Sequence, residues 1–495
     1  MIHPTLEEFR KVARQDALVP VYREILADLE TPVTAYMKVA RNQPYSFLLE
    51  SVERADKIGR YSFIGANPAT VFRSKGSKIA ITREGRIGEY ESEDPLGELR
   101  TLMAAYQPVA VEGIPKFHGG AVGYMSYDQV RFFEKLPDTN PDDLALPDLY
   151  FMITDTILIF DHFNNSLKIV SNVHVRGSVD AAYNEAVRKI DDLSRTLRKP
   201  LVVTTERVHS GDVDETPTSN FSREAFCDAV RKAKEYICAG DIFQVVLSQR
   251  FAREIHASPI NLYRALRSIN PSPYMTLVQY PDVTLVGSSP EVMTQVKGDR
   301  CMVRPIAGTR PRGRTHDEDL DLEKDLLADE KERAEHIMLV DLGRNDVGRV
   351  SKPGSVAPTP SCMMVVERYS HVMHIVSEVA GALKEGEDAF SALAATFPMG
   401  TVSGAPKIRA MEIIDQLEPV RRGPYAGGCG YISFSGDMDT CIIIRTVIVK
   451  DGVAYLQAGA GIVYDSDPDR EYDETVNKAK ALFRAVDFAE KGLDS

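Results

Sequence analysis

The sequence predicts an α+β fold in which large, mostly antiparallel sheets form a sandwich and helices pack outside it. Two observations support this prediction. Short segments rich in β-branched and aromatic residues, bounded by Gly, Pro and Asn, recur in two blocks of the 495-residue chain. Segments with apolar residues at helical intervals follow or interrupt both blocks.

The first block of predicted elements lies in the N-terminal part of the chain. Residues 1 to about 29 resemble a helical lead-in. Strands are then expected at VTAYMKVA (33–40), YSFLLESV (45–52), YSFIGANP (61–68), KIAITREG (78–85) and DTILIFDH (155–162). A helix is expected over 176–197, where Ala, Val, Ile and Leu recur at helical intervals.

The segment 198–220 is polar and carries Pro, Thr and Ser, which is typical of a linker. We therefore expect a first unit over residues 1–200, a linker over 201–220 and a second unit over 221–489. This second unit repeats the mixture of strands and helices.

The second unit begins with a helix that has recognisable ends. Ser222 is the expected N-cap, and Gly240 follows the last helical turn. Further helices are expected at 259–269, 317–342, 388–397, 405–416 and 469–492. Strands are expected at 242–251, 275–280, 284–291, 302–309, 430–436, 441–449 and 453–463.

Composition excludes several classes of partner. The net charge is −13, from 59 basic and 72 acidic residues, which disfavours nucleic acid or an anionic membrane as a partner. No apolar run approaches the roughly 20 residues of a membrane span, and the N-terminus does not resemble a signal peptide. The six cysteines show no C-x-x-C spacing and indicate reduced thiols in a cytoplasmic protein.

Two Glu-x-x-Glu pairs stand on predicted helices, Glu332 with Glu335 and Glu471 with Glu474. Residues three apart share a helix face, so each pair directs two carboxylates to one side. Together they could form an oxygen-rich site for Mg²⁺ that clamps an anionic ligand. Acidic residues near a helix start are also favoured by the helix dipole, so a solvated helix surface is the alternative.

Three loops could bind an anion. PIAGTRPRGRT (305–315) combines Gly with Arg forks, PMGTVSGAPK (398–407) enters a helix with Ser403 as a possible N-cap, and YLQAGAGIV (455–463) allows close approach of backbone. Each has a structural alternative: a flexible basic loop, a capped helix start and a tight bend, respectively. His374 is either structural or a proton carrier.

Taken together, these segments resemble the chorismate-utilising enzymes, in their anthranilate-forming branch. The resemblance rests on LLES, PIAGT, EHIMLVDLGRND, GTVSGAPK, YAGGCGY and GAGIVYDSDPDREYDE, and runs from about Val33 to Ala489. It implies a carbon–oxygen lyase in which ammonia attacks C2 of chorismate, the C4 hydroxyl leaves and pyruvate is eliminated. It also implies a regulatory first unit, a catalytic second unit and Mg²⁺ as cofactor.

The resemblance further assigns roles to individual residues. Glu335 and Glu474 would bind Mg²⁺ directly, with Glu332 and Glu471 acting through water. The expected catalytic residues are Glu291 as the acid for the departing hydroxyl, His374 in pyruvate elimination, and Thr401 near the reacting ring. The expected substrate-binding residues are Gly308, Thr309, Tyr425, Arg445, Gly459, Ala460, Gly461 and Lys478.

Two positions separate the branches of this family. Gln244 stands where relatives that attack C2 with water carry a Lys, and an amide cannot serve as that base. Ala307 stands where another branch carries a nucleophilic Lys, and Ala cannot form a covalent adduct. Attack by ammonia remains. The alternatives are a 2-amino-2-deoxyisochorismate synthase, which retains pyruvate, and an inactive regulatory subunit.

The resemblance also implies regulation and a partner. Ser51, with Pro273, Tyr274 and Met275, matches a pocket for L-tryptophan as feedback inhibitor of tryptophan biosynthesis. The sequence contains no glutamine amidotransferase, so ammonia is expected from a separate amidotransferase subunit, in a heterotetramer.

Overall fold

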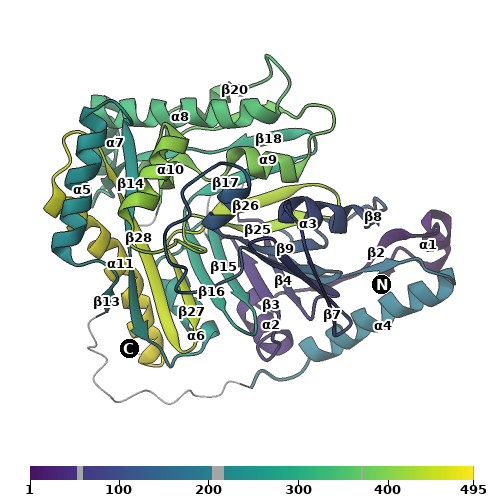
Figure 1. Cartoon of the computed structure of the whole chain (residues 1–495). Coiled ribbons are helices and arrows are strands. Elements are labelled where there is room, and N and C mark those ends of the chain that lie inside the picture. Colours follow the sequence, from purple (N-terminus) through teal and green to yellow (C-terminus); the bar gives the residue numbers. More distant parts are fainter. Residues whose placement is uncertain (53–58, 203–216, 370–371, 494–495) are drawn as a thin grey trace.

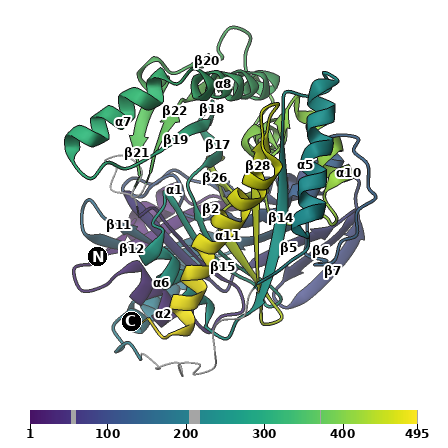
Figure 2. The same ribbon diagram turned by 90° about the vertical axis from the view of Figure 1, so that its left-hand side faces the viewer.

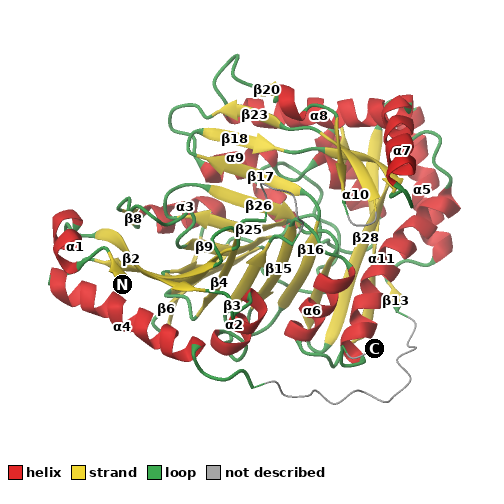
Figure 3. Cartoon of the chain, turned by 180° about the vertical axis from the view of Figure 1, so that it is seen from behind, coloured by secondary structure: helices red, strands yellow, loops and turns green. Residues whose placement is uncertain are grey.

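The computed structural model describes residues 1–52, 59–202, 217–369 and 372–493. Two large sheets face each other, and helices lie outside the strands (Figures 1 and 3). All strand pairs in the described residues are antiparallel, except the short parallel pair of β2 (Ala17–Leu26) with β8 (Gln107–Pro108). The predicted α+β sandwich is confirmed.

The first sheet combines strands from both halves of the chain. Its order is β1 (Ile2–His3), β2, β12 (Ser166–His174), β11 (Thr156–Asp161), β4 (Tyr61–Ala66), β3 (Ser46–Glu50), β15 (Tyr274–Gln279), β16 (Thr284–Ser289), β27 (Thr446–Lys450), β28 (Val453–Ile462), β14 (Gln244–Glu254) and β13 (Thr218–Ser219), with β24 (Gly404–Ala405) on β14 and β8 on β2.

The second sheet also crosses the predicted boundary. Its order is β20 (Ala357–Pro358), β23 (Val379–Ala382), β18 (Arg300–Val303), β17 (Val292–Lys297), β26 (Met438–Ile442), β25 (Gly428–Ser433), β9 (Gly120–Met125), β10 (Leu149–Thr154), β5 (Thr70–Lys75), β6 (Lys78–Arg83) and β7 (Arg86–Glu91). A small third sheet contains β19 (Ile306–Pro311), β22 (Val372–Val376) and β21 (Val365–Arg368). The division into units stays a prediction, and most of the expected linker (203–216) lies outside the described residues.

Apart from α6 and α10, the described α-helices begin at a residue whose side chain accepts a hydrogen bond from a free N–H group of the first turn. They are α1 (Leu6–Val12), α2 (Pro32–Val39), α3 (Pro95–Ala104), α4 (Val179–Leu197), α5 (Arg223–Cys238), α6 (Pro259–Ile269), α7 (His316–Ala328), α8 (Glu330–Val350), α9 (Ala389–Thr396), α10 (Lys407–Leu417) and α11 (Pro468–Glu490). Short 3₁₀ turns are η1 (Tyr127–Phe132), η2 (Pro360–Cys362) and η3 (Gly400–Val402). Within this described part, no helix is both long and apolar enough to span a bilayer.

Three local predictions were wrong. The segment 33–40 is helix α2 and not a strand, because Thr31 caps it and Pro32 occupies its first turn. The lead-in contains only α1 before the long strand β2. The helix expected over 317–342 is two helices, since Asp329 ends α7 and caps α8.

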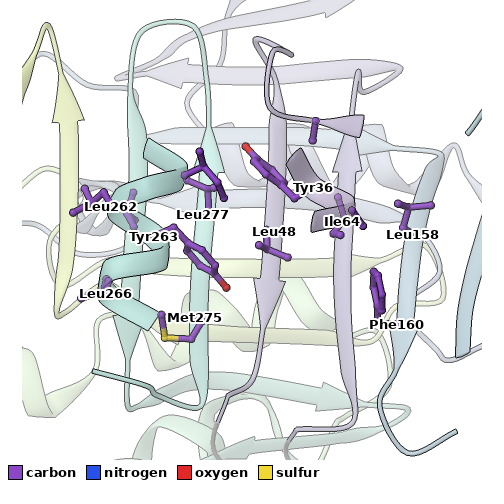
Figure 4. Packing of buried hydrophobic residues seen from close by; sticks show 14 of the residues in the cluster. Tyr36, Leu48, Ile64, Leu158, Phe160, Leu262, Tyr263, Leu266, Met275 and Leu277 are labelled. Atoms are coloured by element: carbon purple, nitrogen blue, oxygen red, sulfur yellow. The ribbon is translucent and has the colours of Figure 1, made fainter. Parts of the chain in front are cut away.

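Alternation along the strands of the first sheet places their side chains in two different buried clusters, one on each face. Leu48 of β3 belongs to the cluster beneath α2, α4, α6 and α11, which also contains Tyr263 and Leu277 (Figure 4). Phe47 and Leu49, its neighbours, pack between the two large sheets. Successive side chains of a strand point to opposite faces, so one strand supplies both layers.

Candidate active site

A cavity of about 830 Å³ opens among β28, the small sheet, η3 and α11. Figure 2 shows α11 crossing in front of β28 and β14. Nine of the predicted site residues line this cavity: Glu291, Thr309, His374, Thr401, Tyr425, Arg445, Gly459, Glu474 and Lys478. Of the predicted catalytic, substrate-binding and metal-binding residues, six do not line it: Gly308, Ala460, Gly461, Glu332, Glu335 and Glu471.

Glu291 is a buried carboxyl at the cavity wall, directly after β16. Burial raises its pKa to about 8, while the nearby Thr401 hydroxyl and Arg445 guanidinium oppose the rise. Neither Glu291 Oε1 nor Thr401 Oγ1 has a hydrogen-bond partner among the described residues. At neutral pH, Glu291 is therefore mainly protonated and suited to donate a proton to a ligand.

His374 lies opposite a bulge in β19, where the pairing with β22 shifts between Ala307 and Thr309. Its Nδ1 is 2.9 Å from the Gly308 carbonyl oxygen and 3.0 Å from Thr309 Oγ1. A carbonyl can only accept, so Nδ1 carries the hydrogen. Burial lowers the pKa of His374, which leaves a neutral ring with its Nε2 lone pair available. Gly308 has φ +73°, a conformation that favours glycine.

The β28 backbone approaches Tyr425 and Lys478 closely. A Cβ at Gly459 would lie 2.8 Å from the Tyr425 hydroxyl oxygen, so only glycine leaves room for that ring. Lys478 Nζ donates to the Gly459 carbonyl oxygen at 2.8 Å and pairs with Glu474 Oε1 at 2.7 Å. Three cationic side chains line the cavity: Arg445, Arg470 and Lys478. Arg445 and Lys478 are the two predicted substrate-binding residues among them, and two cations suit a dicarboxylate ligand.

The two glutamate pairs stand on the first two turns of α8 and α11, which begin at capping aspartates. Burial, followed by the charge of Glu335, raises the pKa of Glu332. Burial also raises the pKa of Glu471, with a smaller contribution from Glu474. A like charge beside each of these carboxylates makes a bound cation favourable.

Side chains connect the starts of the two helices to each other and to β14. Lys331 Nζ is 2.9 Å from Asp465 Oδ2, just before α11. Gln244 Nε2 donates to Glu335 Oε1 at 3.0 Å. Gln244 thus holds a predicted metal ligand in place.

The four glutamates do not form a closed metal cage. Over the described ranges, no three His, Cys, Asp or Glu side chains lie close enough to hold a metal ion by themselves. Mg²⁺ usually keeps several waters and takes only one or two carboxylates plus an anionic ligand. Glu474 lies on the cavity wall, where it pairs with Lys478, and Glu335 accepts from Gln244. One or two carboxylates of this kind are what such an ion takes from a protein.

The predicted inhibitor residues come together beside β3. Met275 of β15 pairs with Glu50, the residue before Ser51, and Val52 N donates to the Ser272 carbonyl oxygen at 3.4 Å. Tyr274 donates from its hydroxyl to Asp439 at 2.8 Å. Pro273 is buried. Their role as an inhibitor site stays a prediction.

A buried network behind the cavity was not predicted. Arg422 is 2% exposed and forms an ion pair with Glu418 at 2.6 Å. Glu418 accepts from Ser248, and Ser248 accepts from Gln457. The RRGPY segment next to Tyr425 offered the one clue, because two arginines precede a predicted site residue.

Comparison with known proteins shows the family of this chain. The family model described as chorismate binding enzyme matches residues 41–484. Anthranilate synthase component 1 of Acetivibrio thermocellus is 48% identical over 99% of both chains, and that of Aquifex aeolicus is 47% identical over 99% of both. The crystal structure of anthranilate synthase component I from Streptococcus pneumoniae has a TM-score of 0.75 and 36% identity, over 92% of this chain and 98% of that one.

The chain therefore belongs to the chorismate-binding enzyme family, in the group formed by the component 1 subunits of anthranilate synthase.

The raised pKa of Glu291 generates a prediction about pH. If Glu291 supplies a proton, kcat/KM for chorismate at saturating ammonia falls as pH rises through about 8, because the carboxyl of the unliganded enzyme loses its proton there. In Glu291→Gln, kcat/KM falls about 10²- to 10⁴-fold and the alkaline limb near pH 8 disappears. The measurement is kcat/KM for chorismate against pH for both proteins. An unchanged alkaline limb in the variant would contradict the assignment.

Proposed function

We propose that this chain converts chorismate and ammonia into anthranilate, pyruvate and water, as the large subunit of an anthranilate synthase in tryptophan biosynthesis. The observation that carries this proposal is one cavity that combines a buried, protonated carboxyl with two cations. Glu291 supplies the acid, and Arg445 and Lys478 suit a dicarboxylate. A carboxylic acid that is neutral at pH 7 is unusual and fits a leaving hydroxyl.

In the first step, the nitrogen of ammonia forms a bond to C2 of the ring. The C4–O bond breaks, and the hydroxyl leaves as water after it takes the proton of Glu291. Thr401, whose hydroxyl has no partner among the described residues, lies beside this acid and near the ring. In the second step, the proton on C2 is removed with the help of His374 Nε2, and the bond between C3 and the enolpyruvyl oxygen breaks. The ring becomes aromatic, and the released enolpyruvate takes up a proton at its methylene carbon to give pyruvate.

The substrate is held by residues of separate segments. Tyr425 and Arg445 bind the carboxylate of the enolpyruvyl group, together with backbone at Gly459, Ala460 and Gly461. The bulge at Gly308 and Thr309 contacts the ring side. Lys478 balances a carboxylate and fixes the Gly459 carbonyl.

Two contacts support ammonia as the nucleophile. The Gln244 amide is engaged with Glu335 and cannot act as a base toward water. Ala307 lines the cavity and offers no nucleophile. A 2-amino-2-deoxyisochorismate synthase would share this chemistry but retain pyruvate, so the pyruvate yield distinguishes the two functions.

Glu335 and Glu474 are the residues that would hold Mg²⁺ directly, with Glu332 and Glu471 acting through water. When bound, the ion would neutralise the ring carboxylate and polarise it as a Lewis acid.

The proposal includes a partner, an inhibitor and a compartment. A separate glutamine amidotransferase subunit, anthranilate synthase component II, would supply ammonia in a heterotetramer. L-tryptophan would bind at Ser51, Pro273, Tyr274 and Met275. The enzyme would work in the cytoplasm.

One assay tests the reaction. The purified chain is given chorismate, Mg²⁺ and ammonium at pH 8, and anthranilate fluorescence and pyruvate are both measured. Equal amounts of the two products support the proposal. Loss of chorismate without pyruvate would indicate the 2-amino-2-deoxyisochorismate synthase. If chorismate is not consumed, the inactive regulatory subunit is the remaining alternative.

The metal assignment predicts the effect of two conservative variants. Glu335→Gln and Glu474→Gln each remove one negative charge that Mg²⁺ needs, so activity at about 1 mM Mg²⁺ should fall by about 100-fold or more. Activity measured against Mg²⁺ concentration shows whether the loss is in metal affinity, and thermal unfolding shows that the variants are folded. Asp465→Asn, which changes the nearby pair with Lys331, is the matched control. Near-normal activity of either glutamate variant would refute the assignment.

The inhibitor assignment predicts that one substitution can weaken inhibition by tryptophan while activity is kept. Ser51→Phe adds a large ring directly after Glu50, which pairs with Met275, and should raise the tryptophan concentration for half-inhibition by about tenfold or more, with kcat nearly unchanged. The measurement is a tryptophan titration at fixed chorismate. An unchanged inhibition curve would show that tryptophan binds elsewhere.

A further inference from the structure

Gln457 is a buried glutamine on the cavity wall whose carbonyl oxygen has no partner. It lies on β28 and is 7% exposed. Its Oε1 makes no hydrogen bond among the described residues, although Gln457 lines the cavity. A buried acceptor without a donor costs about 1–3 kcal/mol, so such groups in folded proteins usually have a function or a ligand.

The orientation of this amide is fixed by a chain of hydrogen bonds. Arg422 donates to both oxygens of Glu418, at 2.6 and 2.9 Å. Since Glu418 accepts throughout, Ser248 must donate its only hydroxyl hydrogen to it, at 2.8 Å. Ser248 Oγ can then only accept, at 2.8 Å, and its donor must be the NH₂ end of Gln457. The carbonyl end is therefore the end left without a partner among the described residues.

Further contacts of Arg422 fix the direction of these hydrogen bonds. Arg422 also donates to the backbone oxygens of Val402 and Val246, both at 2.7 Å, and these residues line the cavity as well. Its guanidinium carbon lies 4.8 Å from the Tyr127 ring centre and 5.6 Å from that of Tyr425. An inverted Gln457 amide would place a second acceptor against Ser248 Oγ and break this chain.

We propose that Gln457 Oε1 accepts a hydrogen bond from an N–H or O–H donor of the bound reactants, and so acts as a substrate-positioning acceptor. This inference rests on the proposed function, whose reactants offer two such donors: the N–H groups of ammonia and the C4 hydroxyl of chorismate. Both carboxylates of chorismate are ionised at neutral pH and would be repelled by a carbonyl oxygen. Gln457 therefore selects for a donor, whereas Arg445 and Lys478 select for carboxylates.

The test is Gln457→Met, which keeps a long side chain and removes the acceptor. Initial rates of anthranilate formation are measured over a grid of ammonium and chorismate concentrations at fixed pH and Mg²⁺. A loss of about 10- to 100-fold in kcat/KM for ammonium, with KM for chorismate little changed, identifies the nitrogen as the donor. The same loss confined to chorismate identifies its C4 hydroxyl.

Gln249→Met is the matched control. Gln249 is a fully buried glutamine of β14 whose two ends are paired with Thr475 and Ser219, and it does not line the cavity. This control should lower the melting temperature without a selective change in either KM. Ser248→Ala, which frees the Gln457 amide, should reproduce the selective loss in weaker form.

Two results would overturn the inference: parameters of Gln457→Met within about twofold of the wild type, or a non-selective loss equal to that of Gln249→Met. If the wild-type chain forms no anthranilate, the proposed function fails first. An active wild type with an unaffected Gln457→Met refutes the Gln457 assignment alone.

Discussion

The buried ion pair between Arg422 and Glu418 is the interaction on which the candidate site depends. A charge taken out of water costs several kcal/mol unless its partners are well placed. Three of the partners of Arg422 belong to residues that line the cavity: the carbonyls of Val246 and Val402, and the ring of Tyr425. Strand β14, turn η3 and the segment after α10 can satisfy Arg422 only in one arrangement, and that arrangement shapes the cavity wall.

The ionisable side chains of the cavity differ in burial, and burial decides which role each can have. Glu291 is deeply buried and keeps its proton near neutral pH. Lys478 and Glu474 are about half exposed on α11 and form an ion pair at 2.7 Å. Burial thus separates an acid for chemistry from charges that bind an anionic substrate and a cation.

Much of this arrangement could be predicted from the sequence, because local patterns report local structure. Helices 259–269 and 388–397 were placed within a residue or two, since caps and apolar spacing mark their ends. The strand predicted over 33–40 is wrong, because β-branched residues favour a strand while the Thr31 cap and Pro32 begin a helix there. The chain from Arg422 to Gln457 could not be foreseen, because each link joins a different segment and leaves no period in the sequence. The spacing of the two helices that carry the glutamate pairs could not be foreseen either, because it depends on packing around Gln244 and Lys331.

The central claim is that this one cavity holds chorismate between a buried acid and a carboxylate-binding wall. A crystal structure of the chain with Mg²⁺ and a non-reactive chorismate analogue tests it most directly. We predict the ring beside Glu291 and Thr401, one carboxylate against Arg445 and Tyr425, and the metal at Glu474. An analogue bound elsewhere, or an empty cavity at a concentration that saturates binding in solution, would contradict the account.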